Sequence, residues 1–339
     1  MISEFHCTLE GHFYVNLSSI SPRDAVWDKF RGQVDGFRDL YKETIFDSYV
    51  ARMGECSGYL KFSQLVDLET GETKLRLDKG SFCRVPRCPV CQWRRQLMWR
   101  AKTFKVMPLI MEEYPDARFI FLTLTIKNCH IDDLREALTL MNKAWNRLTN
   151  RNTFPAIGWI KAVEVTRNHD DDTAHPHFHV LLMVKPGYFT GKYYISQQKW
   201  TEMWKQSLGV NYNPVVDVRA VKTTGKATQE NLQHVLELIK YSVKPEDILT
   251  PQKDGASNID KDKAWLVGLT KALYKMRLIS TGGVLRKYLA ELEKEPEDLI
   301  HSDDLPEDEG AKKSIDILFI WFSHISKYST YAWTANPSD

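Results

Sequence analysis

The sequence predicts an α+β protein in which strands and a helix follow one another through the middle of the chain. Residues 119–127 (FIFLTLTIK) alternate with a period of two, which is typical of a strand. Residues 132–148 repeat apolar side chains at spacings of three and four, which indicates an amphipathic helix. Residues 159–166 and 177–184 again have strand character, and the polar segment 168–174 between them predicts a hairpin.

Each of the first two elements has a definite apolar side. The apolar face of the strand is formed by Ile120, Leu122, Leu124 and Ile126. The other face is mixed and carries Phe121, Thr123 and Thr125. The helix has an apolar stripe made of Leu134, Leu138, Met141 and Trp145. We therefore expect a sheet with its core on one face and a helix packed against that face.

The length of 339 residues suits two domains, or one domain with attachments. We divide the chain into an N-terminal extension (1–50), a cysteine-containing and basic region (51–112), a strand-rich core (113–250) and a C-terminal region (251–339). The last begins with a linker that reaches residue 262 and continues as a mostly helical segment with an acidic stretch.

The composition is that of a globular protein, with 43% hydrophobic and 27% charged residues. Its net charge of +2 does not indicate a nucleic-acid binder, but the charges are unevenly distributed. Residues 80–111 contain no Asp or Glu, whereas residues 291–309 are strongly acidic. Neither a signal peptide nor an apolar run of the ~20 residues needed to span a membrane is present, so we expect a soluble cytoplasmic protein.

Four of the six cysteines lie in one region and favour a zinc site rather than disulfides, which are rare in the cytoplasm. Cys88 and Cys91 form a CxxC pair, and Cys83 and Cys56 lie upstream. Zinc prefers four such ligands in a tetrahedron, and we predict these four. The alternatives are that Cys83 is replaced by His6 or Cys7 as a ligand, or that the cysteines are incidental buried thiols.

Basic side chains follow directly on the cysteines and predict a helix, 93–105, that contacts DNA phosphates. A zinc site would hold this helix rigid. The alternative is a charged face that is simply solvated. The candidate DNA-binding residues are Arg84, Arg87, Arg94, Arg95, Arg100 and Lys102.

The segment AHPHFHVLLMV places His177 and His179 two residues apart on a strand, so both side chains face the same side. In a hairpin, Glu164 of the preceding strand lies across from them. Two imidazoles and a carboxylate give Mg²⁺ or Mn²⁺ a site with an open position for a phosphate oxygen. A bare surface HxH pair is the alternative. His175 joins this face only if the strand continues past Pro176.

Residues 231–244 predict a helix that ends before Pro245. Glu237, Tyr241 and Lys244 share one side of it, opposite an apolar stripe. Tyr241 is a candidate nucleophile, with Lys244 to stabilise a phenolate or phosphate and Glu237 as a base. Alone, a tyrosine on a charged helix face is usually just solvated, so its significance depends on the histidine strand.

In the order FLTLT (121–125), HPHFH (175–179) and ELIKYSVK (237–244), these motifs resemble those of plasmid rolling-circle replication initiators. The class is that of HUH endonucleases with a single tyrosine, and the cysteine segment is similar to the N-terminal part of the same family. The resemblance covers roughly residues 50 to 250. It implies an HUH fold with a central antiparallel sheet of about five strands, flanking helices and a nuclease core at 113–250.

The resemblance also implies the chemistry and the partners. Tyr241 would nick one strand at the double-strand origin and form a 5′-phosphotyrosine link, while His177 and His179 hold the catalytic ion. Glu237 would activate water at termination. The partners would be plasmid origin DNA, presented as a hairpin or a single-stranded nick site, and a host helicase and polymerase. No membrane is expected, and a homodimer is left open.

Two other functions compete with this hypothesis. His175, His177 and His179 formally match the pattern of histidine-triad nucleotide hydrolases, apart from Pro176. Those enzymes need neither a metal nor a tyrosine helix. A non-enzymatic zinc-dependent DNA-binding protein would account for the cysteines and arginines but would leave Tyr241 and the histidines without a role.

Overall fold

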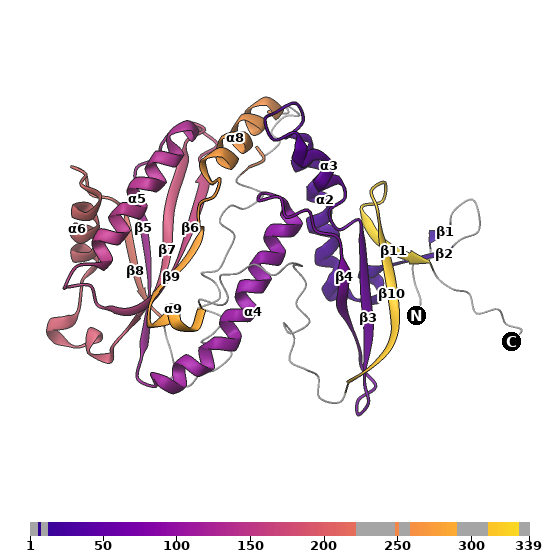
Figure 1. Cartoon of the computed structure of the whole chain (residues 1–339), viewed down its shortest axis with the longest axis horizontal. Coiled ribbons are helices and arrows are strands. Elements are labelled where there is room, and N and C mark those ends of the chain that lie inside the picture. The colour runs from indigo at the N-terminus through magenta and orange to yellow at the C-terminus, as the bar shows by residue number, and fades with distance from the viewer. Residues whose placement is uncertain (1–5, 8–12, 222–247, 251–257, 290–310, 332–339) are drawn as a thin grey trace, which may run out of the picture. The chain divides into compact units, whose positions relative to one another are not determined.

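The computed structural model describes residues 6–7, 13–221, 248–250, 258–289 and 311–331 (Figure 1). The chain divides into two compact units. The first comprises Met1–Met98 together with Pro296–Asp339, and the second is Trp99–Glu295. Each unit has its own antiparallel sheet.

The second unit contains a five-stranded sheet of order β8-β5-β7-β6-β9, in which every neighbouring pair is antiparallel. The predicted antiparallel sheet of about five strands is therefore confirmed. The expected hairpin is also present, because the Asn168 amide donates to the Thr173 carbonyl at 2.9 Å. The strands are β5 (Arg118–Thr125), β6 (Ala156–Arg167), β7 (Ala174–Val184), β8 (Val216–Ala220) and β9 (Ile279–Gly283).

Helices α5 (Leu134–Thr149) and α6 (Gln197–Leu208) cover one face of this sheet (Figure 1). The indole of Trp145 on α5 packs edge-on against Trp159 of β6, with ring centroids 5.1 Å apart. The ring centroids of Trp204 on α6 and Phe178 on β7 are 6.3 Å apart. The predicted helix at 132–148 is thus confirmed, with a short 3₁₀ turn, η2 (Ile131–Asp133), before it.

The opposite face is not bare, contrary to our expectation of helices on one face only. The C-terminal part of α4 (Pro89–Glu113) and α9 (Val284–Leu289) pack over one end of it. Phe119, Leu181 and Met183 are apolar side chains on that face and form a buried cluster with Val106, Met107 and Ile110 of α4. Burying these side chains requires the extra cover. The other end of the same face carries the histidines.

Helix α8 (Ile259–Ala272) begins inside the segment that we expected to be a linker. Its Asp260 and Asp262 occupy the first turn, where carboxylates interact favourably with the helix dipole. Asp262 also accepts a hydrogen bond from the Thr250 amide at 2.9 Å. The expected linker 251–262 is therefore wrong for residues 259–262, which are helical, and residues 251–257 lie outside the described residues.

The first unit contains a six-stranded sheet of order β1-β2-β11-β10-β3-β4, again antiparallel throughout. Its strands are β1 (His6–Cys7), β2 (Phe13–Asn16), β3 (Tyr59–Asp67), β4 (Thr73–Gly80), β10 (Ala311–Phe322) and β11 (Lys327–Tyr331). Its described helices are α1 (Leu17–Ile20), α2 (Val26–Asp39), α3 (Ser48–Gly54) and the first part of α4, up to Met98. The first unit also contains the short 3₁₀ segment η1 (Pro22–Ala25). The 3₁₀ segments η3 (Pro186–Phe189) and η4 (Gly191–Tyr193) belong to the second unit.

The C-terminal region was wrongly expected to be mostly helical. Residues 311–322 and 327–331 form a β-hairpin, and β10 pairs with β3, far away in the sequence. The apolar run ILFIWF is rich in isoleucine and aromatic side chains, which favour a strand, and its Phe319 is fully buried and contacts Phe62 with ring centroids 5.8 Å apart. The acidic stretch 291–309 lies outside the described residues. No helix in the described part of the chain is long and apolar enough to cross a membrane.

Candidate functional site

The sheet of the second unit brings Glu164, His177 and His179 together. Glu164 on β6 is directly opposite His177 on β7, and His179 follows two positions further along the same face. The Glu164 Oε2 atom lies 3.0 Å from His177 Nε2 and 2.6 Å from His179 Nε2. All three potential ligand atoms lie within 4.8 Å of one another.

Strand alternation explains why these polar groups converge. Phe178, Val180 and Val163, which point to the other face, are fully or almost fully buried. Glu164 and His177 are themselves 9% and 8% exposed, whereas the His179 side chain is 30% exposed. The cluster is therefore embedded on the Glu164 side and open to solvent on the His179 side.

The Nδ1 atom of each imidazole contacts another group of the protein. His177 Nδ1 donates to the His175 carbonyl at 3.1 Å, and His179 Nδ1 is 3.3 Å from the Thr123 hydroxyl. These contacts orient both rings so that Nε2 faces Glu164, as metal-binding histidines are usually oriented. Thr123 lies within the FLTLT motif, but we assigned it no role. Its position on the same face as the histidines was the available signal.

The donor set fits a small divalent cation. Adjacent oxygen or nitrogen ligands of an octahedral Mg²⁺ at 2.0–2.1 Å lie about 3 Å apart, close to the two separations between Glu164 and the histidines. Burial opposes ionisation of the Glu164 carboxyl, but hydrogen bonds and charge from His177 and His179 outweigh it and hold its pKa below the ordinary value. The group is therefore a carboxylate, which is the form that binds cations.

His175 lies on this face as well, because β7 continues through Pro176 to Ala174. Its ring is 5.1 Å from that of His177, and burial is the main cause that lowers its pKa. It is not among the three groups whose ligand atoms converge. Its backbone carbonyl, which holds His177, is the contact that it makes with the cluster.

Tyr241, Glu237 and Lys244 lie outside the described residues, as does the whole predicted helix 231–244. The described residues nearest to this segment on each side, Val221 and Ile248, are both buried. The Val221 amide donates to the Phe119 carbonyl, and the Ile248 carbonyl accepts from Arg167.

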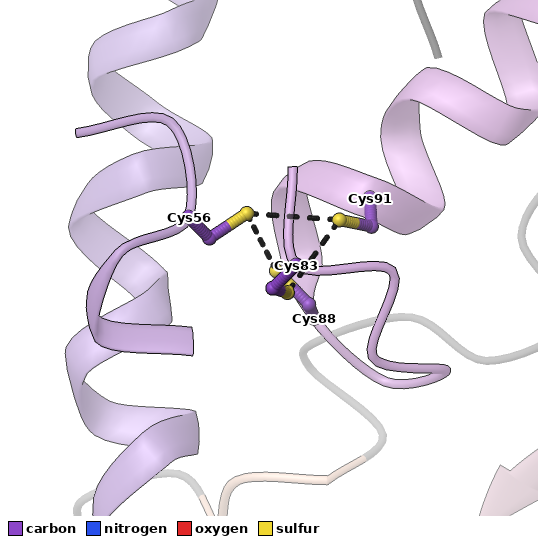
Figure 2. A group of neighbouring side chains, drawn as sticks. All are labelled: Cys56, Cys83, Cys88 and Cys91. Carbon is purple, nitrogen blue, oxygen red and sulfur yellow. Dashed lines mark hydrogen bonds between the residues drawn. The ribbon is translucent and has the colours of Figure 1, made fainter. Parts of the chain in front are cut away.

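The first unit gathers the four predicted cysteines, whose sulfur atoms point toward one another (Figure 2). Cys56 follows α3, Cys83 follows β4, and Cys91 lies in the first turn of α4. The Sγ atoms of Cys56 and Cys91 and those of Cys83 and Cys91 are 3.6 Å apart, and those of Cys88 and Cys56 are 3.5 Å apart. None of the four is in a disulfide.

These separations fit zinc. Four thiolates at ~2.3 Å from a tetrahedral Zn²⁺ have their sulfurs about 3.8 Å apart, whereas disulfide sulfurs lie at ~2.05 Å. Backbone amides support the sulfurs, with Arg84 N 3.3 Å from Cys91 Sγ and Val85 N 3.4 Å from Cys83 Sγ. The hydrogen bonds from neighbouring cysteines lower the pKa of the Cys83 thiol. The preferred set of four is thus brought together. The alternative ligands His6 and Cys7 have side chains that lie outside the described part of the chain.

The predicted basic helix is present as part of α4, although the helix is longer than expected. Arg100 is exposed, and Arg84, Arg94, Arg95 and Lys102 are half-buried. Arg87 differs, since it is only 4% exposed, and desolvation lowers its pKa to about 10. In this structure Arg87 is therefore shielded from any external phosphate. The Arg94 guanidinium stacks on Trp27 at 5.5 Å, next to the cysteine cluster.

Comparison with known proteins shows which family the chain belongs to. A family model described as "Replication protein" matches residues 74–329. The chain is 35% identical over 296 residues to "Protein rep" of Streptococcus pneumoniae serotype 2, which covers 85% of each chain. It is 34% identical over 293 residues to "Protein rep" of Bacillus amyloliquefaciens, covering 82% of this chain and 83% of that one. No solved structure matches this chain. The chain belongs to the replication protein family.

Proposed function

We propose that this replication protein is a plasmid initiator that nicks one DNA strand at the double-strand origin, in the manner of HUH endonucleases. The observation that carries the proposal is the convergence of Glu164, His177 and His179 on a face that is open beside His179. Membership of the replication protein family makes DNA the expected partner and does not favour a histidine-triad hydrolase.

The proposed reaction is a phosphoryl transfer. The phenol oxygen of Tyr241 attacks the scissile phosphorus, and the bond from phosphorus to the 3′ oxygen breaks. The phenol loses its proton, and the departing oxygen gains one to become a free 3′-OH primer. A Mg²⁺ or Mn²⁺ ion held by Glu164, His177 and His179 would polarise the phosphate. Lys244 would stabilise negative charge, and Glu237 would activate water in the second, terminating cleavage.

The four cysteines support a separate, structural role in this proposal. Cys56, Cys83, Cys88 and Cys91 would bind one zinc ion and hold the start of α4 in place. The basic residues of that helix would contact phosphates of origin DNA. A host polymerase would extend the 3′-OH and a host helicase would unwind ahead, in the cytoplasm.

A labelled origin hairpin and Mn²⁺ test the proposal. The attack leaves the downstream fragment on the protein, so a label on that side should migrate with the denatured protein. A label on the upstream side should instead appear on a free fragment with a 3′-OH. A non-enzymatic DNA-binding protein would retain neither label after denaturation, and that result would contradict the proposal.

A further inference from the structure

A cavity opens in the second unit on the sheet face opposite the histidines. It has a volume of about 620 Å³ and lies between α5, β6 and β9. Strand β6 lines it with Ala156, Trp159 and Lys161, and the last two alternate with the strand positions that lead to Glu164. The volume lies within the ~300–1,000 Å³ of typical ligand pockets.

The wall of the cavity combines cations, amides and aromatic rings. Lys161, Arg277 and Arg286 contribute positive charge, and the described residues that line the cavity include no Asp or Glu. Helix α5 contributes amide groups, among them those of Asn142 and Asn146. The rings lining it include Trp145 and Trp159, which meet edge to face. Cationic side chains can pair with a phosphate, amide groups can hydrogen-bond to the edge of a base, and aromatic rings can stack on the face of the base.

Lys161 is unusual because it is buried and no described carboxylate pairs with it. It is 4% exposed and forms no ion pair with any described acidic residue. Its ammonium donates to Asn142 Oδ1 at 2.5 Å and lies 4.1 Å from the centroid of the Phe178 ring. Desolvation lowers the pKa of Lys161 to about 8. An anion in the cavity would supply the charge that a buried ammonium normally requires.

A second buried donor in the same wall lacks an acceptor. Trp145 is 1% exposed, and its indole Nε1 has no hydrogen-bond partner among the described groups. Most buried polar groups in proteins are hydrogen-bonded, so this donor is an exception in a side chain that lines the cavity. Glycine also shapes the wall, since a Cβ on Gly282 would overlap the Trp159 indole, with 2.2 Å between that Cβ and Cε2. The indole can therefore lie against the bare backbone of β9.

We propose that this cavity binds one nucleotide of a single DNA strand, with the phosphate near Lys161 and Arg286 and the base among the rings and amides. The inference rests on the proposed function, because the nicking reaction brings single-stranded DNA to this protein. The bound nucleotide would lie on the face away from Glu164, His177 and His179. It would hold the strand without taking part in the chemistry.

Two variants with matched controls test this in the full chain. Asn146→Asp adds a carboxylate to the cavity wall, while Thr139→Asp adds one to an exposed position of the same helix. Arg286→Ala removes a lining cation, while Lys287→Ala removes its exposed neighbour, which does not line the cavity. The readouts are the affinity for a labelled oligodeoxythymidylate, its salt dependence, and the rate of adduct formation on the origin hairpin at saturating DNA.

We expect Asn146→Asp to weaken oligonucleotide binding about tenfold through like-charge repulsion, with less than about a twofold change for Thr139→Asp. Arg286→Ala should reduce the steepness of the log–log salt dependence by about 0.7, the value for one phosphate contact of a single strand. Lys287→Ala should leave it unchanged. Adduct formation at saturating DNA should be unaffected in all four variants.

Unchanged oligonucleotide binding in both cavity variants would overturn the inference while leaving the nicking function intact. Conversely, weakened binding in a protein that forms no adduct would support the cavity and contradict the nicking function. A free nucleotide could occupy the cavity in place of a nucleotide within a strand. Deoxythymidine monophosphate is the probe for that case. If it binds wild type but not Asn146→Asp, and oligonucleotide affinity is equal in both, the cavity serves a free nucleotide and the strand inference is wrong.

Discussion

At the scale of single residues, Glu164 links the two histidines of the candidate catalytic site. One carboxylate oxygen lies within hydrogen-bonding distance of both Nε2 atoms, and the side chain is nearly buried. The sequence allowed this contact to be predicted, because a hairpin between 159–166 and 177–184 places Glu164 across from the histidines. The supporting contact from Thr123 depends on which strand lies on the other side of β7, and that neighbour could not be derived from periodicity.

Replacing Glu164 by Gln should therefore weaken Mn²⁺ binding at least tenfold, because the shape is kept and the anionic ligand is lost. Titration of Mn²⁺ followed by electron paramagnetic resonance measures the affinity directly. Glu202→Gln is the matched control, since Glu202 is an exposed acid on α6 that pairs with Lys199 at 3.0 Å. Equal Mn²⁺ affinities in the two variants would show that Glu164 is not a ligand.

At the scale of elements, the hairpin of β6 and β7 is tied to α8 by a buried ion pair. Arg167, whose side chain is 1% exposed, donates to Asp262 at 2.7 Å and to the Ile248 carbonyl at 2.8 Å. It also pairs with Asp172 at 2.8 Å, but the Asp172 side chain is 38% exposed. The Arg167 guanidinium thus pairs with two carboxylates, one nearly buried (Asp262) and one exposed (Asp172).

Asp262→Ala should lower the free energy of unfolding by about 3–5 kcal/mol, since it removes the buried partner of Arg167 and leaves only the more exposed Asp172 among the described carboxylates that pair with it. Asp172→Ala should cost less than about 1 kcal/mol, because water screens the exposed partner. Urea denaturation of the full chain, followed by tryptophan fluorescence, compares the two losses. The account of this ion pair is wrong if both substitutions destabilise the protein equally.

The basic part of α4 makes a different prediction. Replacing Arg94 and Arg95 together by Ala should weaken origin binding. The slope of log affinity against log salt concentration should become less steep by about 0.9 for each lost contact with a duplex phosphate. Because Arg94 also stacks on Trp27, a thermal melt should accompany the binding measurement to confirm folding. If the folded double variant retains the wild-type salt slope, the helix face is only a solvated charged surface.

At the scale of the whole molecule, local pattern predicted the second unit better than the first. The strands near the histidines and the helix at 132–148 follow periodicities that lie within each segment. The first unit depends on β10 pairing with β3, and no local pattern specifies so distant a partner. Helix α2 was missed although Trp27, Phe30 and Val34 are buried at helical spacing.

The two candidate metal sites lie in different units, and we expect them to respond independently. Cys88→Ser should lose the single zinc expected per chain and destabilise the first unit, while Mn²⁺ binding at Glu164 persists. Cys129→Ser is the control, because Cys129 is a free cysteine of the second unit outside the cluster. Elemental analysis that finds the same zinc content in both variants would contradict the four-cysteine site.

The central claim is that a replication protein with this histidine cluster attacks DNA through Tyr241. The most direct measurement is mass spectrometry of the peptide that carries the nucleotide after incubation with an origin hairpin and Mn²⁺. We predict that the modified residue is Tyr241, that Tyr241→Phe binds the hairpin but forms no adduct, and that Glu237→Ala still forms it. A nucleotide found on another residue, or an adduct that persists in Tyr241→Phe, would contradict the account.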